Sequence, residues 1–585
     1  MIALIALLAC NPAPDASDLD GTRGGRVDIF FNDPGTNADN MWESDAIDVM
    51  VTLIDNTKVT LDVAVMGFSY DRVVDAIIRA YDRGVEVRFV GDAGHLYNDG
   101  YEAVFERHIP AVTGNLAHIM HHKFLVSDGR FVFCGTANWT DTDLVHNSNN
   151  FVMIDSPAVA DDFTDEFEQM FEGTFGANKI EIDNGRVYQV GDTTVEVWFS
   201  PNEDAMGRIL EYVDAAQESV RFTIFAFTKD QVGSAFIRKQ EEFDDLDAAE
   251  GIDLDGDLES RRWVAGVIDQ SQLHSNGQYH EVYRLLGGGI PMRLDGNDNS
   301  KQPGDYQAGG GRLHSKTMLI DANGEEPVVI TGSFNWSASA TVSNDEYLLV
   351  LKGPRVADQF QQYFDRLWAA GRTLGGDRVG TEFEDGSELG VGDIVINEVM
   401  WYGVNHQDPS GYDEFIELRN LTQNRIDLDM WQVAGVDDVL VGLPPGSYVE
   451  PGGYFTILDH TLEPYVDGAP QDEVSAFSDG DLVVNAFNDD RQSRLYIKDG
   501  SLELLLKDPD GNVLDVAGDG GPAFAGGPEQ KGTIVRSMER SAVPGDGADP
   551  ANWHACSLEL GGGNVNPEFQ DQVRATPDQD NSSPL

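Results

Sequence analysis

One pattern of residues occurs twice in this chain, and its repetition constrains the fold more than any other feature. The first copy runs from His121 to Trp139 and the second from His314 to Trp336. Each copy has a His, a Lys two residues later, an Asp five residues after the Lys, and then Gly-Thr/Ser-x-Asn-Trp. A single gap of four residues before Gly332 aligns the copies. Because chance does not repeat so long a pattern in register, the chain is predicted to contain two equivalent halves.

The spacing within each copy predicts a strand, a turn and a return strand. On an extended chain residues i and i+2 share a face, so His121 and Lys123 point the same way, as do His314 and Lys316. The apolar residues after each Lys predict a buried strand, and an Asp then opens a polar turn. The return strand brings Gly-Thr/Ser-x-Asn back to the same end of the sheet. An imidazole, an ammonium, a hydroxyl and an amide therefore converge, a set suited to a phosphate oxyanion.

Both copies resemble the HKD motif, HxKxxxxD followed by GSxN, of the phospholipase D superfamily. The resemblance implies an α/β fold: a duplicated α-β-α sandwich of mixed sheets flanked by helices, whose two copies face each other across a pseudo-two-fold axis. It also implies that one imidazole attacks phosphorus while the other protonates the departing oxygen, through a phosphohistidine. No cofactor and no metal ion are expected, because two lysines supply the positive charge.

The resemblance assigns a role to each polar residue of the motifs. The lysines and asparagines are expected to neutralise and hydrogen-bond the non-bridging oxygens. The hydroxyls assist through side-chain or backbone donors, and the aspartates bridge backbone or a nearby base. The expected catalytic residues are His121, Lys123, Asn138, His314, Lys316, Asn335 and Glu346, and the expected supporting residues are Asp128, Asp321, Thr136, Ser333 and Asn149.

The two copies differ at one informative position. In the family a carboxylate after GSxN often hydrogen-bonds the catalytic imidazole; Glu346 holds that position in the second copy and Asn149 in the first. A carboxylate neighbour favours the imidazolium, whereas an amide does not. The prediction is that His121 is the nucleophile and that His314, paired with Glu346, is the general acid. The alternative is that Asn149 marks a weakened first site.

The acidic composition limits the partners of the chain. It has 39 basic and 101 acidic residues, a formal net charge of −62 and a pI near 4.2. Such a field repels DNA, RNA and anionic bilayers at long range, although it also serves simply as a solubility device. Of the three cysteines, Cys134 is expected to be an inert core thiol, and a Cys134–Cys556 disulfide is not expected because it would join different domains.

The N-terminus predicts export. The stretch MIALIALLAC is an apolar run that ends at Cys10, and a polar, proline-containing segment follows. It resembles a bacterial lipoprotein signal, in which Cys10 becomes the lipidated first residue, although the run is short and no Lys or Arg precedes it. No other stretch approaches about 18 continuous apolar residues, so no transmembrane helix is expected. We expect an exported cell-envelope lipoprotein or extracellular protein, with residues 1–25 as signal and linker.

Strand-helix-strand patterns precede each motif and define the repeats as 26–185 and 186–375. Apolar residues at helical spacing predict a helix at 71–84 in the first repeat and near 231–243 in the second. The acidic stretch 241–260 is expected to be a solvated loop, since it lacks the spacing of a calcium-binding EF-hand. The glycine-rich stretch 295–312 is expected to be a mobile loop, either a lid or a long connection.

The C-terminal part has a different pattern. A Gly-, Asp- and Glu-rich linker at 376–390 leads into short alternating strands separated by turns, which predict a β-sandwich over 391–567. The segments INEVMW, DEFIELRN, IDLDMW and SMER resemble the lamin tail domain, an immunoglobulin-like sandwich. Residues 568–585 are expected to be a disordered tail.

The substrate is less constrained than the chemistry. Phospholipid hydrolysis fits export and anchoring near lipid, and the protein is expected to be monomeric because one chain carries both motifs. The alternative is an exported endonuclease, which the compact GTANWT and GSFNWS forms favour and the missing basic stripe opposes. A third hypothesis is a non-enzymatic surface-anchored binding protein, which would not require two intact motifs.

Overall fold

The structure is a computed structural model, and it places most of the chain. The residues it describes are 25–32, 44–182, 186–252, 260–269, 271–273, 280–296, 311–374, 389–402, 414–435, 439–444, 447–459, 465–466, 469–470, 476–477, 480–484, 495, 497, 500–509, 511–529, 534–559, 562, 564–565 and 569–583. The predicted signal with Cys10, most of the linker 376–390 and most of the glycine-rich loop 295–312 lie outside these residues. The chain divides into two compact units, one mainly before residue 373 and one mainly after it.

The first half of unit 1 is built on a mixed sheet with strand order β1-β7-β6-β5-β2-β3-β4. Strands β2, β3 and β4 are parallel to one another, whereas β5 runs antiparallel to β2 and begins the motif hairpin with β6. The strands are β1 (Arg26–Asn32), β2 (Thr60–Val65), β3 (Glu86–Asp92), β4 (Ala111–Gly114), β5 (Lys123–Ser127), β6 (Phe131–Gly135) and β7 (Asn149–Asp155).

The second half repeats this order and confirms the predicted duplication. Its sheet runs β16-β12-β11-β10-β13-β14-β15-β9-β8, so β9 to β15 correspond to β1 to β7 in the same spatial sequence. Strands β8 and β16 extend the two edges. The strands are β8 (Arg186–Val190), β9 (Thr193–Ser200), β10 (Ser219–Ile224), β11 (Trp263–Ile268), β12 (Met292–Leu294), β13 (Lys316–Ile320), β14 (Val328–Gly332), β15 (Glu346–Lys352) and β16 (Arg372–Leu374).

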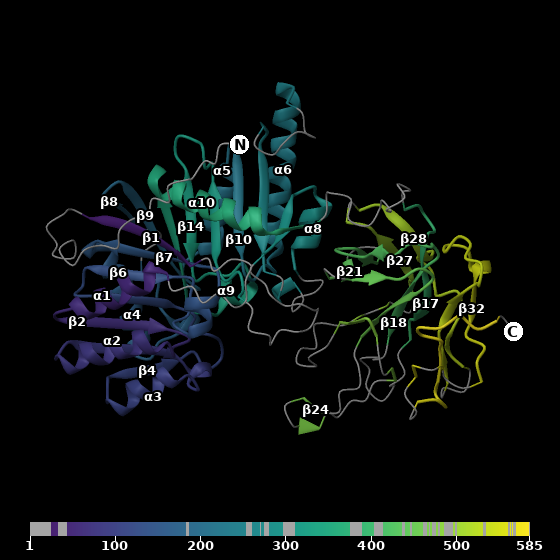
Figure 1. The fold of residues 1–585 in the computed structure, drawn as a ribbon, viewed down its shortest axis with the longest axis horizontal. Coiled ribbons are helices and arrows are strands. Elements are labelled where there is room, and N and C mark those ends of the chain that lie inside the picture. The colour runs from purple at the N-terminus through teal and green to yellow at the C-terminus, as the bar shows by residue number, and fades with distance from the viewer. Residues whose placement is uncertain are drawn as a thin grey trace, which may run out of the picture. The chain divides into compact units, whose positions relative to one another are not determined.

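Helices cover the two sheets of unit 1 (Figure 1). Buried residues of α4 and α10 pack between the sheets in one apolar core that both halves share, which explains why the two repeats form a single unit. A second core lies under α1 and α2 in the first half. The helices are α1 (Asp45–Asn56), α2 (Asp71–Asp82), α3 (Asp99–Glu106), α4 (Pro157–Phe171), α5 (Ala205–Ala215), α6 (Asp230–Glu250), α9 (Ala338–Val342) and α10 (Pro354–Ala370).

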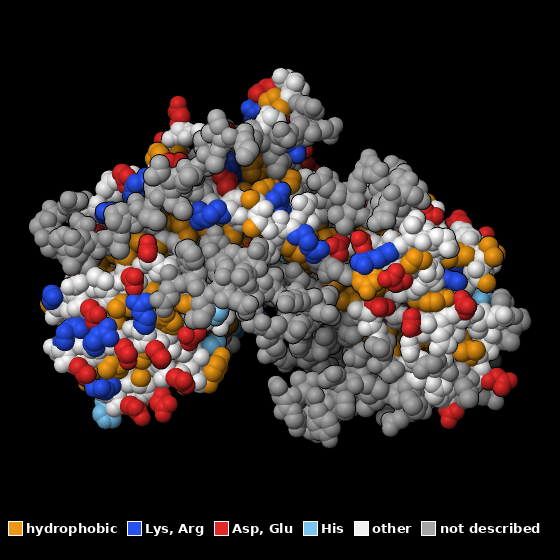
Figure 2. Space-filling view, in the orientation of Figure 1, with side chains coloured by type: hydrophobic (Ala, Val, Ile, Leu, Met, Phe, Trp, Pro, Cys, Tyr) orange, Lys and Arg blue, Asp and Glu red, His pale blue; other side chains and the backbone are white. Residues whose placement is uncertain are grey.

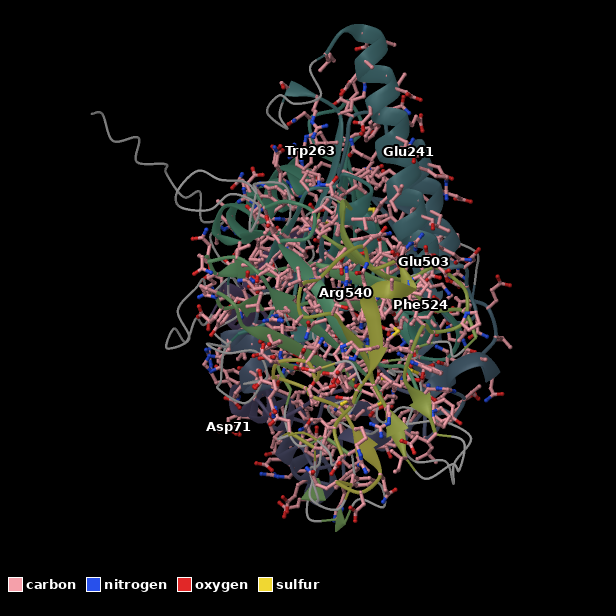
Figure 3. The ribbon with its side chains drawn as sticks, turned by 90° about the vertical axis from the view of Figure 1, so that its right-hand side faces the viewer. Asp71, Glu241, Trp263, Glu503, Phe524 and Arg540 are labelled. Carbon is pink, nitrogen blue, oxygen red and sulfur yellow. The ribbon has the colours of Figure 1, made fainter. Side chains whose placement is uncertain are left out.

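Helix α6 corrects one expectation. The acidic stretch from Glu241 was expected to form a loop, but α6 continues through it to Glu250 (Figure 3). Phe243 and Asp247 are buried on this extension, and Asp247 accepts hydrogen bonds from the backbone and guanidinium of Arg262. The segment is therefore helical because one of its faces is buried and Asp247 forms an ion pair, although its acidic composition alone predicts a solvent-exposed loop.

Unit 2 confirms the predicted strand-rich sandwich. A six-stranded sheet and a four-stranded sheet enclose an apolar core that includes Trp431. Arg540 is buried on β31, where its guanidinium bonds both oxygens of Asp515 and lies over the ring of Trp553 (Figure 3). The larger sheet consists of β26 (Leu482–Val483), β23 (Tyr454–Leu458), β18 (Phe415–Asn420), β17 (Ile394–Met400), β31 (Met538–Arg540) and β32 (Trp553–Ala555). The smaller consists of β21 (Val439–Gly442), β20 (Gln432–Ala434), β27 (Glu503–Lys507) and β28 (Val513–Gly518).

Short strand pairs complete unit 2, and one segment from earlier in the chain joins it. The remaining strands are β19 (Ile426–Asp427), β22 (Tyr448–Val449), β24 (Tyr465–Val466), β25 (Ala469–Pro470), β29 (Gly527–Pro528), β30 (Val535–Arg536) and β33 (Val573–Arg574). Residues 273–291, which carry α8 (Val282–Gly287), group with this unit although they fall inside the predicted second repeat. The ring of Tyr283 lies against Gly442, where no larger residue would fit.

The prediction that residues 568–585 form a disordered tail is wrong for the described residues 569–583. Residues 569–583 lie against the larger sheet, where Glu398, Glu417 and Glu539 are buried on adjacent strands. Thr576 donates to Glu398 from its backbone nitrogen at 2.9 Å and its hydroxyl at 3.0 Å. Asp578 and Ser582 donate backbone hydrogens to Glu417 and Glu539. The polar tail is ordered because it supplies hydrogen-bond donors to buried carboxyl groups that would otherwise be unsatisfied.

The two buried cysteines that the structure describes, Cys134 and Cys556, are free thiols, as predicted. Among the described residues, no helix combines the length and apolar composition needed to cross a bilayer.

The buried glutamates predict a pH dependence of stability. Burial, with the neighbouring charge of Glu539, raises the pKa of Glu398 to about 8. The folded state therefore keeps a proton that the unfolded state releases near pH 4.5, and stability falls as pH rises from about 4.5 to about 8, by about 1.4 kcal/mol per pH unit for one proton.

In urea titrations of the full chain, the unfolding free energy of wild type should fall relative to that of Glu398→Gln as the pH rises through this window, because only wild type carries the carboxyl that must stay protonated. The exposed Glu450→Gln variant is the control and should track wild type at every pH. A constant difference between wild type and Glu398→Gln would show that Glu398 is not protonated in the folded state.

Candidate functional site

The two motif histidines are brought together by an exchange of backbone between the halves. His121 N donates to the carbonyl of Asp345 in the second half at 2.9 Å. His314 N donates to the carbonyl of Ser148 in the first half, also at 2.9 Å. Isolated parallel bridges join Met120 to Asp345 and Ser148 to Leu313. The predicted convergence of the two motifs on one site is thus present, and each histidine segment is fixed to the opposite half.

An aspartate at the end of a parallel strand supports each histidine segment. Asp92 ends β3 and accepts a hydrogen bond from Met120 N at 2.8 Å. Asp269 follows β11 and accepts one from Leu313 N at 3.0 Å. These equivalent contacts fix the residue before each motif histidine. The motif analysis missed both aspartates, although each follows a predicted strand at the same place in its repeat.

The imidazole of His121 pairs with Glu346, which corrects the sequence prediction. Nδ1 of His121 donates to Oε2 of Glu346 at 2.6 Å, and both side chains are buried. The prediction paired Glu346 with His314, its neighbour in the same copy. That pairing is wrong because β15 begins beside the histidine segment of the other half, so Glu346 projects to His121.

His314 has two partners in the first half. Its Nδ1 lies 3.3 Å from Oδ1 of Asn149 and 3.5 Å from Oδ1 of Asp143. Asn149 donates its amide hydrogen to the backbone carbonyl of Asp143, which orients the amide oxygen towards the imidazole. Asn149 therefore occupies the position predicted for it, but it serves the opposite histidine and shares it with a carboxylate that the motif analysis missed.

Burial keeps both imidazoles largely neutral at pH 7. Burial lowers the pKa of His121 to about 4, although the nearby charge of Glu346 opposes this shift. Burial raises the pKa of Glu346, but its interactions with His121, Lys123 and Ser333 outweigh burial and hold that pKa below its usual value. Burial also lowers the pKa of His314 well below its usual value, and the positive charges of Lys316 and Lys123 add to the effect.

The two motif lysines are buried beside the imidazoles. Each donates to the carbonyl of its own histidine: Lys123 Nζ to His121 at 2.6 Å, and Lys316 Nζ to His314 at 2.5 Å. Burial lowers the pKa of Lys123 to about 8. Burial and the charge of Lys123 lower the pKa of Lys316 to about 7. These lysines are poorly compensated cations, and an anion entering the site would be attracted to both.

The motif hydroxyls hold other side chains of the site. Ser333 Oγ donates to Glu346 Oε2 at 2.6 Å, and Thr136 Oγ1 donates to Asn149 Oδ1 at 2.7 Å. The prediction had these hydroxyls assist at the phosphate. The structure instead uses them to orient Glu346 and Asn149, because each return strand lies beside the strand on which that residue stands.

The two motif asparagines differ in their surroundings. Asn138 donates from its backbone and its amide to Oδ2 of Asp143, at 2.8 and 2.6 Å. Asn335 has Ala340 at the equivalent of Asp143, and its buried Oδ1 has no hydrogen-bond partner among the described residues. One amide is thus anchored by a carboxylate, and the other is not.

Asp128 and Asp321 are structural, as predicted. The carboxylate of Asp128 accepts the backbone hydrogens of Lys58, Val59 and Thr60, and that of Asp321 accepts those of 217–219. Each aspartate has a positive φ, 51° for Asp128 and 49° for Asp321. Asp128 thus joins the turn after β5 to the start of β2, and Asp321 joins the turn after β13 to the start of β10. Both contacts lie at the end of the sheet opposite the motif histidines.

Two further groups lie outside the predicted set. Phe225 contacts the ring of His314 at a centroid distance of 4.7 Å and lies 4.9 Å from Lys316 Nζ. His122, the next residue after His121, donates to Glu166 at 2.8 Å in a buried ion-pair cluster with Lys179. Among the described residues, no group of three or more His, Cys, Asp or Glu side chains is arranged to hold a metal ion.

Comparisons with known proteins agree with this architecture. Residues 50–171 and 209–368 match the family described as "Cardiolipin synthase, PLD-like domain", and residues 389–521 match the Lamin Tail Domain. The chain is 28% identical over 115 residues to a mitochondrial cardiolipin hydrolase of Chlamydomonas reinhardtii and 29% identical over 140 residues to that of Danio rerio. These matches cover 19% and 23% of this chain and span 52% and 60% of the relatives.

A solved structure resembles one part of the chain. It is the phospholipase D family member Nuc from Salmonella typhimurium, with 24% sequence identity and a TM-score of 0.24. The match covers 32% of this chain and 99% of that one.

Asp128 gives a direct test of the structural role. Asp128→Ala should lower the free energy of unfolding by roughly 1–3 kcal/mol, because three backbone hydrogens lose their acceptor and Ala disfavours a positive φ. Asp128→Asn should cost less, since Asn keeps one acceptor oxygen and tolerates this conformation. Urea titrations of the three proteins measure the difference. A stable Asp128→Ala protein that has lost its catalytic activity would contradict the assignment.

Proposed function

Because unit 1 carries the paired motifs and PLD-like domain of the phospholipase D superfamily and the C-terminal part is a lamin tail domain, we propose that this chain is a phosphodiesterase that hydrolyses phospholipid headgroups through a phosphohistidine. The observation that carries the proposal is the buried meeting of two imidazoles and two ammonium groups from opposite halves. The proposed reaction needs only the side chains of this site and a water molecule.

In the first step His121 is the nucleophile. Its Nδ1 hydrogen is held by Glu346, which leaves the lone pair on Nε2 free to attack phosphorus. The new N–P bond makes the ring cationic, and the adjacent carboxylate stabilises that charge. The P–O bond to the leaving group breaks as His314, protonated on both ring nitrogens once the anionic substrate is bound, gives the leaving oxygen its Nε2 proton and becomes neutral. Lys123 and Lys316 stabilise the negative charge that collects on the non-bridging oxygens.

In the second step water regenerates the enzyme. Neutral His314 accepts a proton from water as its oxygen attacks phosphorus, and the P–N bond to His121 breaks. The phosphomonoester leaves, and both imidazoles return to their starting states. The assignment of nucleophile and acid is that of the sequence prediction. Its physical basis is different, since Glu346 supports the nucleophile and not the acid.

Phospholipid is favoured over nucleic acid by charge and by the relatives. The formal net charge of −62 opposes approach to a polyanion. On the face drawn in Figure 2, Lys and Arg side chains are interspersed with acidic ones over the described residues. Two relatives carry the name mitochondrial cardiolipin hydrolase, which supports a lipid substrate. A binding protein without catalysis would not need the paired site.

Export with a lipid anchor at Cys10, and a monomeric state, stay predictions from the sequence. Each would place or present the same site without changing its chemistry.

The experiment compares substrates and locates the covalent intermediate. Vesicles of phosphatidylcholine, phosphatidylethanolamine or cardiolipin and, in parallel, single-stranded and plasmid DNA are incubated with wild type, His121→Ala and His314→Ala. We expect headgroup release by wild type and its loss in His121→Ala by at least about 100-fold, because removal of the nucleophile leaves no covalent route.

The intermediate is trapped with bis(p-nitrophenyl) phosphate, whose leaving group needs little protonation. His314→Ala should then accumulate phosphoryl label on the peptide containing His121, since the base for hydrolysis is missing. Label on His314 in His121→Ala would reverse the roles. DNA cleavage without headgroup release would replace the lipid substrate by nucleic acid, and equal inactivity of wild type and His121→Ala on every substrate would leave the binding protein.

A further inference from the structure

The carboxylate that the first repeat lacks at Asn149 is present elsewhere in the same repeat. Asp143 lies four residues after Trp139, on the short π-helix Thr142–His146, and is buried. The equivalent position four residues after Trp336 is Ala340. Each half therefore contributes one buried carboxylate, from position 143 in the first and from Glu346 in the second.

We propose that Asp143 is the positioning residue that orients His314 and favours its protonated form, in the place that Glu346 takes beside His121. The proposal rests on the paired-histidine reaction above and extends it to a residue outside both motifs. Oδ1 of Asp143 lies 3.5 Å from His314 Nδ1 and accepts a hydrogen bond from Asn147. Its other oxygen is held by Asn138, so the carboxylate cannot turn away.

The charges around His314 explain why such a partner is needed. Lys316, Lys123, His121 and Arg312 all disfavour its cationic form, and burial adds to them. The amide of Asn149 offers an acceptor but no charge. Asp143 is the carboxylate within 4 Å of the imidazole among the described residues. Without Asp143, no nearby carboxylate would offset the four positive or titratable neighbours that disfavour protonation of His314.

The test separates positioning of the acid from support of the fold. Asp143→Asn keeps the size and most hydrogen bonds but removes the charge. We expect the basic limb of the pH–rate profile to move to lower pH, because the acid must be protonated and its pKa falls. In Glu346→Gln the acidic limb should move to lower pH, because the nucleophile must be neutral and loses its anionic partner.

Leaving groups give a second readout. Hydrolysis of a diester with an alkyl leaving group needs the acid, whereas a p-nitrophenyl leaving group departs without protonation. Asp143→Asn should therefore lose at least about ten-fold more activity on phosphatidylcholine, whose choline leaves as an alkyl alcohol, than on bis(p-nitrophenyl) phosphate. Glu346→Gln should slow both by similar factors.

The rescue variant is Asp143→Asn with Asn149→Glu, which moves the carboxylate to the position that Glu346 holds in the other half. It should restore the basic limb and the alkyl substrate, and it serves as the test protein if Asp143→Asn does not fold. Equal losses on both leaving groups with an unmoved basic limb would show that Asp143 only anchors Asn138, and would overturn the proposal while leaving the paired-histidine reaction intact.

A different observation concerns the surface beside His121. Three short segments, 93–98, 115–119 and 338–343, are named here the apolar rim. Five of the fourteen exposed large apolar side chains among the described residues lie on it: Leu96, Tyr97, Leu116, Ile119 and Val342. The side chains of Leu116 and Tyr97 are the most exposed of the five, at 92% and 75%. The concentration is unusual, since exposed apolar side chains normally occur singly.

Hydrogen bonds join the three segments next to the site. Asn115 donates to the carbonyl of Ser343 at 3.1 Å, and Ile119 N donates to Asn344 at 3.4 Å. Asp92 binds both His95 and Met120, which links the first segment to the second. The rim therefore stands at the strand ends that carry His121 and Glu346.

The rim is also free of charge. None of its residues is Asp, Glu, Lys or Arg, in a chain with 101 acidic residues. An acidic rim would repel phosphate headgroups, whereas this one offers apolar side chains and two histidines. We infer that the apolar rim seats the enzyme on a phospholipid surface and presents His121 to the headgroup layer; this rests on the lipid substrate proposed above.

The test uses Leu116→Asp with Val342→Asp and, as matched control, Val59→Asp, which changes a 65% exposed residue at the start of β2, away from the histidines. Sedimentation with phosphatidylcholine vesicles and headgroup release should fall at least about ten-fold in the rim variant, because two apolar side chains no longer enter the interface. Hydrolysis of soluble bis(p-nitrophenyl) phosphate should be unchanged in both variants.

Equal vesicle binding by wild type and rim variant would overturn the inference. Wild type that cleaves bis(p-nitrophenyl) phosphate and DNA but neither binds nor hydrolyses vesicles would also overturn it, and would remove the lipid substrate while the phosphodiesterase stands.

Discussion

Two backbone hydrogen bonds between the halves hold the candidate site together. His121 is fixed to the carbonyl of Asp345, and His314 to the carbonyl of Ser148. The next residue along each accepting strand is Glu346 or Asn149, so the same crossing delivers the side chain that each imidazole contacts. Neither half alone contains a motif histidine together with the side chain that its imidazole contacts. The shared apolar core beneath α4 and α10 therefore does more than stabilise the unit, because it sets the distance on which both pairs depend.

The sequence predicts the parts of this site better than their connections. Spacing predicts the hairpins and the polar turn that Asp128 opens, because both are local consequences of alternation and turn chemistry, whereas the facing of the two copies and the structural role of Asp128 come from the family resemblance. The partner of Glu346 is not local. Aligning the copies places Glu346 in the same motif as His314, and nothing in the alignment records that the strands cross between halves. An alignment of the two copies shows which residues are equivalent, but it does not show which residues of one copy contact the other.

Composition misleads where tertiary contacts satisfy polar groups. The stretch beginning at Glu241 has the acidity of a loop, but it continues α6 because Phe243 and Asp247 find buried partners. The tail has the polarity of a disordered segment, yet its donors meet buried glutamates of the sandwich. In both cases the deciding residues lie far along the chain, where a window of local composition cannot include them.

The duplicated site is symmetric in charge but not in sequence. The first half has an amide, Asn149, where the second half has the carboxylate of Glu346. Conversely, the first half has the carboxylate of Asp143 where the second half has Ala340. The two solutions are not equivalent in geometry: Glu346 approaches its imidazole at 2.6 Å, and Asp143 stands 3.5 Å from its own. A short contact suits a ring that becomes cationic as it bonds to phosphorus. A longer one suits a ring that must gain and release a proton in one cycle.

The charges of the site also explain how a buried general acid becomes protonated. Two lysines and two carboxylates surround the imidazoles, and the pKa values of both histidines lie below their usual range. A phosphodiester brings one further negative charge into this low-dielectric space, which raises the proton affinity of every nearby base. His314 lies beside Lys316, whose pKa of about 7 already leaves it partly uncharged at neutral pH. In the proposed reaction, substrate binding therefore draws a proton to His314, and the bound phosphodiester itself completes the acid that its leaving group requires.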